Sequence, residues 1–251
     1  MEISNEKRLA VLIDADNVSY KNVKPIMSEI AKYGIPTYKR IYGDWTMPNL
    51  AGWKNILLDS GIIPIQQYGY TTGKSSTDSA MIIDAMDILY SSNIDGFCIV
   101  SSDSDFTRLA LRLREAGKIV IGIGEKKTPS PFIAACEKFI YTEIIEPEEK
   151  PSKSVSKAKI IEQQTSSINN DLKTISILIE NTINDIADDD GFAFLGDVGN
   201  MLAKIQPDFD SRNYGFKKIS QLIVSLNKFD VEDRKLPNQS TKLLYVKNRS
   251  N

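Results

Sequence analysis

The stretch GFCIVSSDSDFTRLALRLREAGKIVIGI, residues 96–123, contains a complete strand–helix–strand pattern. Its two ends, Gly96–Ser101 and Lys118–Ile123, are short apolar runs without polar alternation, which is typical of strands buried on both faces of a parallel sheet. Between them, Asp105–Ala116 has the apolar spacing of a helix, and Gly117 provides a stop signal. The stretch therefore predicts one β–α–β unit.

The same alternation of apolar runs and amphipathic segments extends over residues 7–145. Further strands are expected at Arg8–Asp14, Ile35–Tyr42 and Gly61–Tyr68, and further helices at Val23–Tyr33, Asn49–Ser60, Asp78–Tyr90 and Pro131–Lys138. Strands and helices that alternate at this spacing indicate β–α units and a parallel sheet. We therefore predict that residues 1–146 form an α/β domain with a mostly parallel sheet.

Residues 147–170 are rich in Pro, Ser, Lys, Glu and Gln, and we predict a linker there with a short helix near Lys157–Gln164. Residues 171–251 return to apolar periodicity. Three helices are expected at Asp171–Ala187, Leu195–Lys204 and Asn213–Asn227, followed by a hairpin formed by KFDVED and KLLYVK. Three helices and a hairpin predict a small C-terminal winged helix-turn-helix domain.

Composition excludes several classes of protein. Histidine is absent from the 251 residues, which excludes Ser-His-Asp and Cys-His catalytic units and any His-ligated metal. The two cysteines, Cys98 and Cys136, lie in apolar segments, so a disulfide scaffold and a four-thiolate zinc site are excluded, and reduced core residues of a cytoplasmic protein are expected. The chain has no apolar run of about 18 residues and no secretion-signal pattern, so neither a membrane span nor export is expected.

Charge is unevenly distributed in a chain whose net charge is only −2. Residues 171–210 contain 2 basic and 9 acidic side chains, whereas residues 211–249 contain 9 basic and 3 acidic side chains, so the net charges are −7 and +6. A cationic surface is typical of phosphate binding, and we predict contacts with nucleic-acid phosphates from Arg212, Lys217 and Lys218. The alternative is a solvated helix face and wing.

Three acidic motifs follow a predicted strand or open a predicted helix. DADN, residues 14–17, follows the first strand, SSDSDF, residues 101–106, follows the strand at 96–101, and Asp78 opens the helix at 78–90. The carboxyl ends of the strands form the ligand-binding edge of an open parallel sheet, so we expect these carboxylates to meet there. Crowded carboxylates repel one another unless a cation compensates them, and Mg²⁺ or Mn²⁺ suits oxygen ligands.

The candidate metal ligands and catalytic residues are Asp14, Asp78, Asp103 and Asp105. Taken singly, Asp78 and Asp105 are equally well explained as helix N-caps. Asp16 is a candidate supporting carboxylate. Asp84 is another, although six helical residues rotate it about 120° away from Asp78, so that a purely structural role remains open for it.

Two loops after the second and third predicted strands should face the same edge. Trp45 lies in the first loop, and Tyr70 and Lys74 lie in the second. Aromatic and basic side chains on such loops suit base stacking and phosphate pairing, so we predict RNA contacts from all three. Packing over the sheet edge explains Trp45 equally well.

The motifs LIDADN, Lys74–Asp78 running into the IDAMD helix, and SSDSDF together resemble the NYN family of PIN-like metal-dependent ribonucleases. The resemblance covers about residues 7–145. It implies a Rossmann-like α/β/α sandwich with an acidic pocket that cleaves single-stranded or structured RNA with Mg²⁺ or Mn²⁺. The matching acidic positions are Asp14, Asp78, Asp103 and Asp105, and Asn17 matches as a residue that orients a ligand or water.

The second unit resembles the OST-HTH/LOTUS domain over about residues 171–249. The pattern runs through Gly191-Phe192, Leu195–Gly199, Pro207–Asp210, Tyr214–Ile219 and Phe229. This resemblance implies a winged helix that binds RNA and, in some members, a protein partner. Together the two resemblances imply a nuclease with an appended targeting module.

Two other functions compete with this hypothesis. Asp14-Ala15-Asp16 also resembles the nucleophile motif of haloacid-dehalogenase-type phosphatases, but the segment SSNIDGFCIV lacks the lysine that such enzymes need before their late acidic motif. A catalytically inert RNA-binding protein is the other alternative. We predict a metal-dependent ribonuclease that binds RNA and has no membrane partner.

Overall fold

A computed structural model describes residues 6–68, 76–145, 157–235 and 242–249 of the chain. Its contacts divide the chain into two compact units, Met1–Glu148 and Glu149–Asn251. Each unit has a separate hydrophobic core, so each is described by itself.

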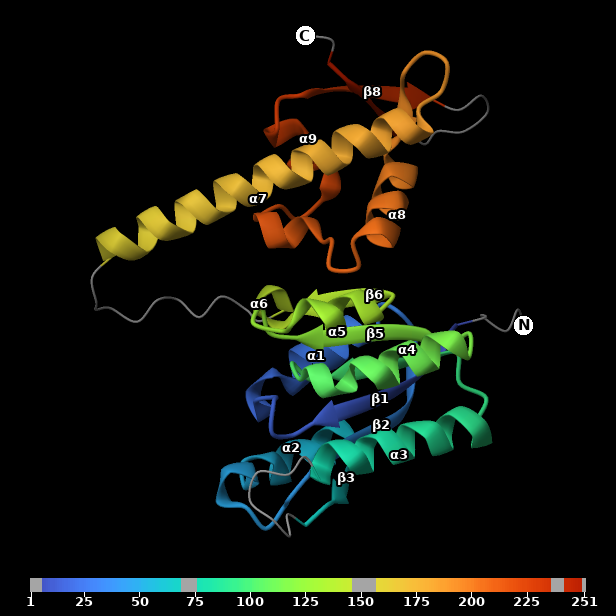
Figure 1. Ribbon diagram of the computed structural model, residues 1–251, viewed down its shortest axis with the longest axis vertical. Coiled ribbons are helices and arrows are strands. Elements are labelled where there is room, and N and C mark those ends of the chain that lie inside the picture. The colour runs from blue at the N-terminus through green and yellow to red at the C-terminus, as the bar shows by residue number, and fades with distance from the viewer. Residues whose placement is uncertain (1–5, 69–75, 146–156, 236–241, 250–251) are drawn as a thin grey trace. The chain divides into compact units, whose positions relative to one another are not determined.

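The first unit is built on a six-stranded sheet in which every strand pair is parallel (Figure 1). The strands are β1 Arg8–Asp14, β2 Ile35–Gly43, β3 Ile63–Gln66, β4 Gly96–Val100, β5 Ile119–Gly124 and β6 Lys138–Tyr141. Their order across the sheet is β3-β2-β1-β4-β5-β6. Strands β1 and β4 are almost completely buried, as their continuous apolar sequences predict.

Helices cover both faces of this sheet. The α-helices are α1 Val23–Ile30, α2 Trp53–Ser60, α3 Ser76–Ser91, α4 Thr107–Glu115, α5 Ser130–Ala135 and α6 Thr142–Ile145. Apolar residues of α3, α4 and α5 form the core on one face, and those of α1, α2 and α6 pack on the other. The predicted Rossmann-like α/β/α sandwich is confirmed.

The strand order places the candidate site. The chain moves from β1 outward to β2 and β3, then returns to β4 beside β1 and continues to β5 and β6. The connections that follow β1 and β4 therefore lead in opposite directions across the sheet, which is the arrangement at which open α/β sheets bind their ligands. The first and second acidic motifs follow these two adjacent strands.

The C-terminal end of the first unit differs from the sequence prediction. The helix expected at Pro131–Lys138 ends at Ala135, and Lys138–Tyr141 forms the edge strand β6. A Cβ at Gly122 of β5 would lie 2.5 Å from the Phe139 ring, so the glycine makes room for this strand to pack. Sequence periodicity could not reveal this long-range contact.

The second unit combines helices with a small antiparallel sheet, as in a winged helix. Its elements are α7 Lys157–Ile186, β7 Ala193–Phe194, α8 Leu195–Ile205, α9 Ile219–Ser225, β8 Phe229–Lys235 and β9 Lys242–Asn248. The strand order is β7-β9-β8, and α7, α8, α9 and the sheet share one core. The predicted hairpin corresponds to β8 and β9.

Two helices of this unit differ from the sequence prediction in where they begin or end. Helix α7 begins at Lys157, inside the predicted linker, and continues without a break to Ile186. The helix expected at Asn213–Asn227 is interrupted because Gly215 adopts a φ of 85°, a left-handed conformation that ends a preceding 3₁₀ turn. In the described part of the chain, no helix combines the length and apolar character needed to span a bilayer.

Candidate metal centre and nucleic-acid surfaces

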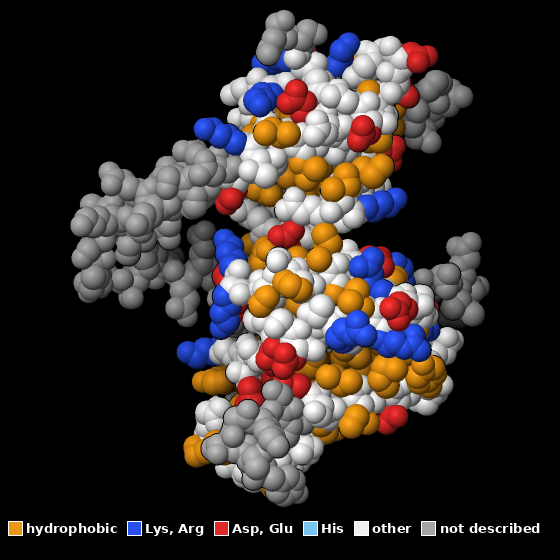
Figure 2. Space-filling view, in the orientation of Figure 1, with side chains coloured by type: hydrophobic (Ala, Val, Ile, Leu, Met, Phe, Trp, Pro, Cys, Tyr) orange, Lys and Arg blue, Asp and Glu red, His pale blue; other side chains and the backbone are white. Residues whose placement is uncertain are grey.

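Three of the four predicted metal ligands meet at the carboxyl edge of the sheet. Asp78 lies in the first turn of α3, and Asp103 and Asp105 lie between β4 and α4. One carboxylate oxygen from each residue lies within 4.8 Å of the others. Figure 2 shows acidic side chains gathered on this face of the first unit. We call Asp78, Asp103 and Asp105 the acidic group.

The turn after β4 fixes two members of this group. The Asp105 backbone N–H donates to Oδ1 of Asp103 at 2.9 Å, so Asp103 caps the short 3₁₀ helix Ser104–Phe106. The Asp103 backbone N–H in turn donates to the Ser101 hydroxyl at 3.1 Å. The helix N-cap is therefore Asp103, and not Asp105 as the sequence alone allowed. Capping uses one of its two carboxylate oxygens, which is compatible with a ligand on the other.

Asp14 occupies the end of β1 but is held by protein donors. It is 1% exposed. Its Oδ2 accepts hydrogen bonds from Asn17 Nδ2 at 2.6 Å and from the Ser101 hydroxyl at 2.9 Å, and its Oδ1 accepts the Asp16 N–H at 3.0 Å. Asp14 thus links the end of β1 to the end of β4, and Asn17 holds Asp14. The structure does not place Asp14 among the three clustered carboxylates.

Asp16 lies in a locally acidic environment. Partial burial, followed by the negative charges of Asp14 and Asp44, raises the pKa of Asp16 above its usual range. Sequence reasoning did not select Asp44, which accepts hydrogen bonds from the Thr46 hydroxyl at 2.6 Å and from Gln66 at 2.9 Å. A bound cation nearby would favour the ionised form of these carboxylates.

Asp84 faces β2. Its carboxylate is paired with Arg40 and accepts a hydrogen bond from the hydroxyl of the buried Tyr42. Burial, followed by the hydrogen bond to Asp84, raises the pKa of Tyr42. Asp84 therefore has a structural partner set, and it is not part of the acidic group. The rotation that separates it from Asp78 along α3 accounts for this difference.

Of the three loop residues predicted to contact RNA, the structure describes Trp45. The Trp45 indole N–H donates to the carbonyl of Ile65 at 2.9 Å, and its backbone N–H donates to Gln66 at 3.0 Å. Trp45 also packs against the core on the α1–α2 face. These contacts support the packing alternative. Tyr70 and Lys74 lie outside the described residues.

Sequence reasoning missed two lysines at the same edge. Lys126 and Lys127 are exposed in the loop after β5, the strand next to β4. This loop is tied to the acidic motif because the Glu125 N–H donates to the Ser102 hydroxyl at 2.9 Å. Lys127 pairs with Glu125 at 2.7 Å. The signal was available in the sequence, since a loop that follows a parallel strand adjacent to β4 must reach the same edge.

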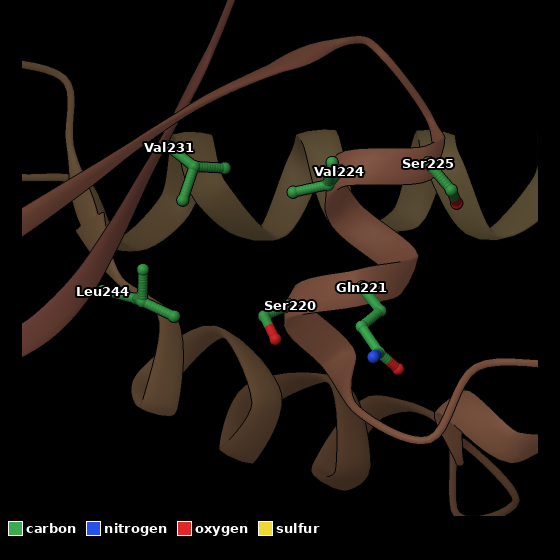
Figure 3. A pocket seen from close by; sticks show the side chains of 6 residues that line it. All are labelled: Ser220, Gln221, Val224, Ser225, Val231 and Leu244. Atoms are coloured by element: carbon green, nitrogen blue, oxygen red, sulfur yellow. The ribbon is translucent and has the colours of Figure 1, made fainter.

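The second unit contains a shallow apolar groove of about 390 Å³ between α9 and the β8–β9 hairpin (Figure 3). Its lining residues are Ser220, Gln221, Val224, Ser225, Val231 and Leu244. The lining carries no charged side chain and no nucleophile paired with a base, so it is not suited to chemistry on a phosphodiester.

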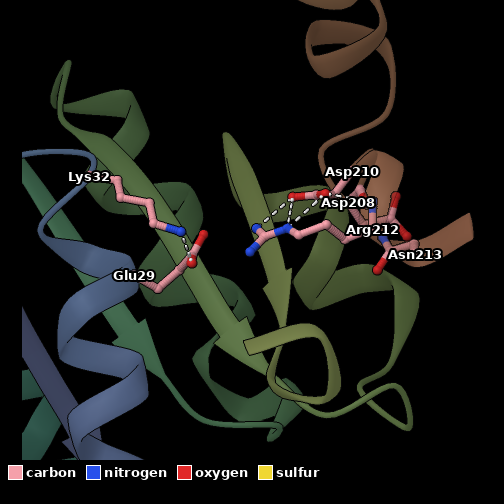
Figure 4. A network of polar contacts seen from close by, with 6 residues as sticks. All are labelled: Glu29, Lys32, Asp208, Asp210, Arg212 and Asn213. Atoms are coloured by element: carbon pink, nitrogen blue, oxygen red, sulfur yellow. Dashed lines mark hydrogen bonds and ion pairs between the residues drawn. The ribbon is translucent and has the colours of Figure 1, made fainter. Parts of the chain in front are cut away.

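Many cations of the second unit are neutralised within it. Arg212, a predicted phosphate contact, forms a forked ion pair with Asp210 whose closest approach is 2.7 Å (Figure 4). Similar pairs are Arg234–Asp190 at 2.7 Å, Lys242–Asp233 at 3.3 Å and Arg249–Asp230 at 2.7 Å. Lys217 and Lys218 are exposed, and neither forms an ion pair with a carboxylate in the described residues. They are the stronger candidates for phosphate contact.

Comparison with known proteins identifies two domains. The sequence matches the NYN domain model over residues 8–146, more than half of the chain, and the OST-HTH/LOTUS domain model over residues 167–241. These matches have the order that the motifs predicted. No curated protein matches the chain.

Two solved structures are similar to parts of the chain. A crystal structure of a Vibrio parahaemolyticus protein of unknown function has 20% identity and a TM-score of 0.46, with 55% of this chain and 94% of that chain covered. A solution structure of an uncharacterized Nitrosomonas europaea protein has 30% identity and a TM-score of 0.28, with 42% of this chain and 87% of that chain covered.

Proposed function

This chain belongs to the NYN-domain family, and on that premise we propose that it is a metal-dependent ribonuclease with a C-terminal RNA-targeting module. The observation that carries the proposal is the acidic group, in which three carboxylates from two elements converge within 4.8 Å. Such a group is costly for a folded protein unless a cation offsets the repulsion.

The donor set fits a hard divalent ion. All three clustered side chains offer carboxylate oxygens, which Mg²⁺ and Mn²⁺ prefer, and one of them is exposed, leaving access for water and substrate. Asp78, Asp103 and Asp105 would hold the ion, and Asp14 would act at the same edge directly or through water. When bound, such an ion activates water and stabilises the negative charge that develops on a phosphodiester.

The chain's own residues position this site. Asp14, with Asn17 and Ser101, fixes the ends of β1 and β4 relative to one another through the hydrogen bonds at 2.6 Å and 2.9 Å. Asp16 adds negative charge beside it. Lys126 is placed to contact a non-reacting phosphate, since its loop is anchored to Ser102. The histidine-free composition is compatible with this chemistry because every assigned role uses a carboxylate, a hydroxyl or an amine.

The second unit would provide affinity for RNA. Lys217 and Lys218 precede α9 and are exposed, so they are suited to phosphate contact, whereas Arg212 is engaged by Asp210. A protein partner on this unit remains part of the proposal through the OST-HTH/LOTUS match. Because Cys98 and Cys136 are buried free thiols, we place the protein in the reducing cytoplasm.

A cleavage assay tests the proposal. Labelled single-stranded and hairpin RNA would be incubated with the full chain in Mn²⁺, Mg²⁺ or EDTA, beside Asp78→Asn and the matched control Asp84→Asn on the same helix. We expect metal-dependent cleavage by the wild type and Asp84→Asn, and its loss in Asp78→Asn. Salt-sensitive RNA binding without cleavage in either metal would instead establish an inert RNA-binding protein.

A thermal measurement tests the metal separately from catalysis. A ligand at 100 times its Kd stabilises the native state by about 2.7 kcal/mol. Mn²⁺ should therefore raise the Tm of the wild type, and Asp105→Asn should reduce this rise. Asp105→Asn removes one of the repelling charges at an exposed position, so the substitution itself should leave the metal-free Tm unchanged or slightly higher.

A further inference from the structure

We propose that the surface between α3 and α4 carries a single RNA strand away from the acidic group. This surface, here called the α3–α4 strip, consists of Ile83 and Tyr90 on α3 and Arg108 and Arg112 on α4. The inference rests on the proposed function and extends it by assigning the path of the substrate.

The strip is exposed and combines two kinds of side chain. Ile83 is 63% exposed and Tyr90 is 70% exposed, so α3 presents two large side chains on the face opposite its buried side. Seven residues separate them, so they lie on one line along α3. Arg108 and Arg112 are exposed and four residues apart, so they lie on one line along α4. Figure 2 shows basic side chains beside a band of hydrophobic side chains on this face.

A hydrogen bond joins the two helices within the strip. Arg112 Nη2 donates to the Tyr90 hydroxyl at 2.5 Å, which places the guanidinium at the hydroxyl end of this side chain. Neither Arg108 nor Arg112 forms an ion pair with a carboxylate in the part of the chain described. Arg114 on the same helix is different, because its Nη1 donates to the carbonyl of Ala135 at 3.2 Å. The strip arginines are thus available to a ligand, whereas Arg114 has a structural role.

The strip begins at the candidate site. Asp78 lies in the first turn of α3, and Asp105 lies two residues before α4 begins at Thr107. Both helices therefore start beside the acidic group and run away from it on the same face of the sheet. With a rise of about 1.5 Å per residue, Arg112 lies about 10 Å beyond Asp105 and Tyr90 about 18 Å beyond Asp78. A strand bound at the acidic group therefore needs several nucleotides to reach Tyr90.

Single-stranded RNA fits this chemistry better than a protein surface does. Guanidinium groups contact phosphate oxygens with charge-assisted hydrogen bonds, and an exposed tyrosine offers a face for an unpaired base. Exposed Asp87 on α3 and Glu115 on α4 lie beside the strip and offset the charge of its two arginines. Binding of an anionic strand would therefore rest on direct contacts from the two unpaired guanidinium groups and not on net charge. A protein partner would more often bury an apolar patch from which charges are depleted.

The salt dependence of RNA binding tests the arginines. Binding of a 12-nucleotide single-stranded RNA to the full chain would be measured in EDTA by fluorescence anisotropy over a range of salt. Arg108→Gln/Arg112→Gln should lower the magnitude of the log–log salt slope by about 1.4, since each phosphate contact to a single strand contributes about 0.7. The control Lys24→Gln/Lys54→Gln removes the same charge from exposed positions of α1 and α2, on the other face, and should leave the slope unchanged.

Strand length and Tyr90 provide an independent test. Tyr90→Ala should weaken binding of the 12-nucleotide strand several-fold, and Tyr90→Phe, which keeps the ring, should retain most of the affinity. A 4-nucleotide strand with one end in the acidic group should be insensitive to both changes. Arginine substitution should also raise KM for long substrates without changing kcat, because the contact is made equally in ground and transition states.

The results separate this inference from the proposed nuclease activity. An unchanged salt slope in Arg108→Gln/Arg112→Gln would overturn the α3–α4 path, even if the wild type cleaves RNA. An unchanged slope together with an altered molecular mass in solution would also overturn it and assign the strip to a protein interface. A reduced slope in a protein that never cleaves RNA would support the path and reject the nuclease. Glutamine retains good helix propensity, so the variants should fold.

Discussion

The acidic edge of the first unit and the cationic surface of the second unit carry their charges differently. At the acidic edge, Asp78, Asp103 and Asp105 are brought together within 4.8 Å. In the second unit, four of the basic residues between 211 and 249 pair with nearby carboxylates. The first region therefore concentrates charge of one sign, whereas the second pairs four of its nine basic side chains with carboxylates.

The difference shows that the placement of charged side chains is a better guide to phosphate binding than the net charge of a segment. The value of +6 for residues 211–249 comes from sequence alone, but two of the paired carboxylates, Asp190 and Asp210, belong to the preceding acidic segment and are not counted in it. Ion pairs on an exposed surface leave fewer unpaired cations to contact a ligand, and they add little to the stability of the fold. A phosphate-binding role in the second unit thus depends on Lys217 and Lys218 more than on the total charge.

The largest effect on this comparison is expected from a substitution of Asp103. Asp103→Asn should lower kcat by about 100-fold or more, equivalent to about 2.7 kcal/mol of transition-state stabilisation, because it removes one negative charge from the acidic group. Asparagine also caps helices well, so the hydrogen bond from the Asp105 N–H should persist and the Tm should change little. Single-turnover cleavage in Mn²⁺ and a thermal melt measure both quantities. A variant with wild-type turnover would remove Asp103 from the site.

Much of the first unit could be predicted because local patterns coincide with the fold. Apolar runs identified β1, β4 and β5, and the parallel arrangement then required the acidic motifs after β1 and β4 to lie at one edge. The convergence of Asp78 with Asp103 and Asp105 follows from the same topology. No comparable rule exists for β6, whose place depends on the fit of Phe139 over Gly122.

The remaining features depend on contacts between distant residues. The rotation of Asp84 away from Asp78 left a structural role open, but its partners come from β2, more than 40 positions earlier, and could not be identified from the α3 sequence. The burial of Asp14 depends on Ser101, 87 positions away. The break at Gly215 was in principle detectable, since a glycine inside an expected helix is a warning of a turn.

Asp84 tests the distinction between carboxylates that take part in catalysis and carboxylates that stabilise the fold. Asp84→Ala would leave the Arg40 guanidinium and the Tyr42 hydroxyl without their shared acceptor. Because Tyr42 is buried and the pair is partly exposed, we expect a loss of about 1–3 kcal/mol in the free energy of unfolding. Denaturant unfolding measures this loss. Cleavage per folded molecule should stay within a few-fold of the wild type, and a 100-fold loss would return Asp84 to the site.

Lys217 and Lys218 test the other side of the comparison. Lys217→Gln/Lys218→Gln should weaken RNA binding by about tenfold near 0.1 M salt and reduce the magnitude of the salt slope by about 1.4, since two phosphate contacts are lost. The matched control is Arg249→Gln with Lys242→Gln, which removes two cations that are already paired with carboxylates. Titrations over a salt series compare the two variants. Equal slopes would show that pairing does not decide which cations bind RNA.

The smallest expected effect concerns the pair formed by Arg234 and Asp190. A hydrogen bond from the Phe192 N–H, followed by one from Arg234, holds the pKa of Asp190 below its ordinary value of about 3.9. A carboxyl group with a depressed folded-state pKa contributes stability above its unfolded pKa, and that contribution disappears as the pH falls through the folded pKa. Wild type should therefore be slightly more stable than Asp190→Asn at pH 6, and the difference should disappear in strong acid, where the carboxyl group is protonated in both the folded and the unfolded state. Urea unfolding at both pH values measures it. In the same variant, Arg234 keeps only its longer ion pair with Glu232 at 3.4 Å. Arg234 should then be more available to RNA phosphate, and the salt slope should steepen slightly. A surface neutralised by internal pairs requires this change, whereas a preformed cationic surface does not.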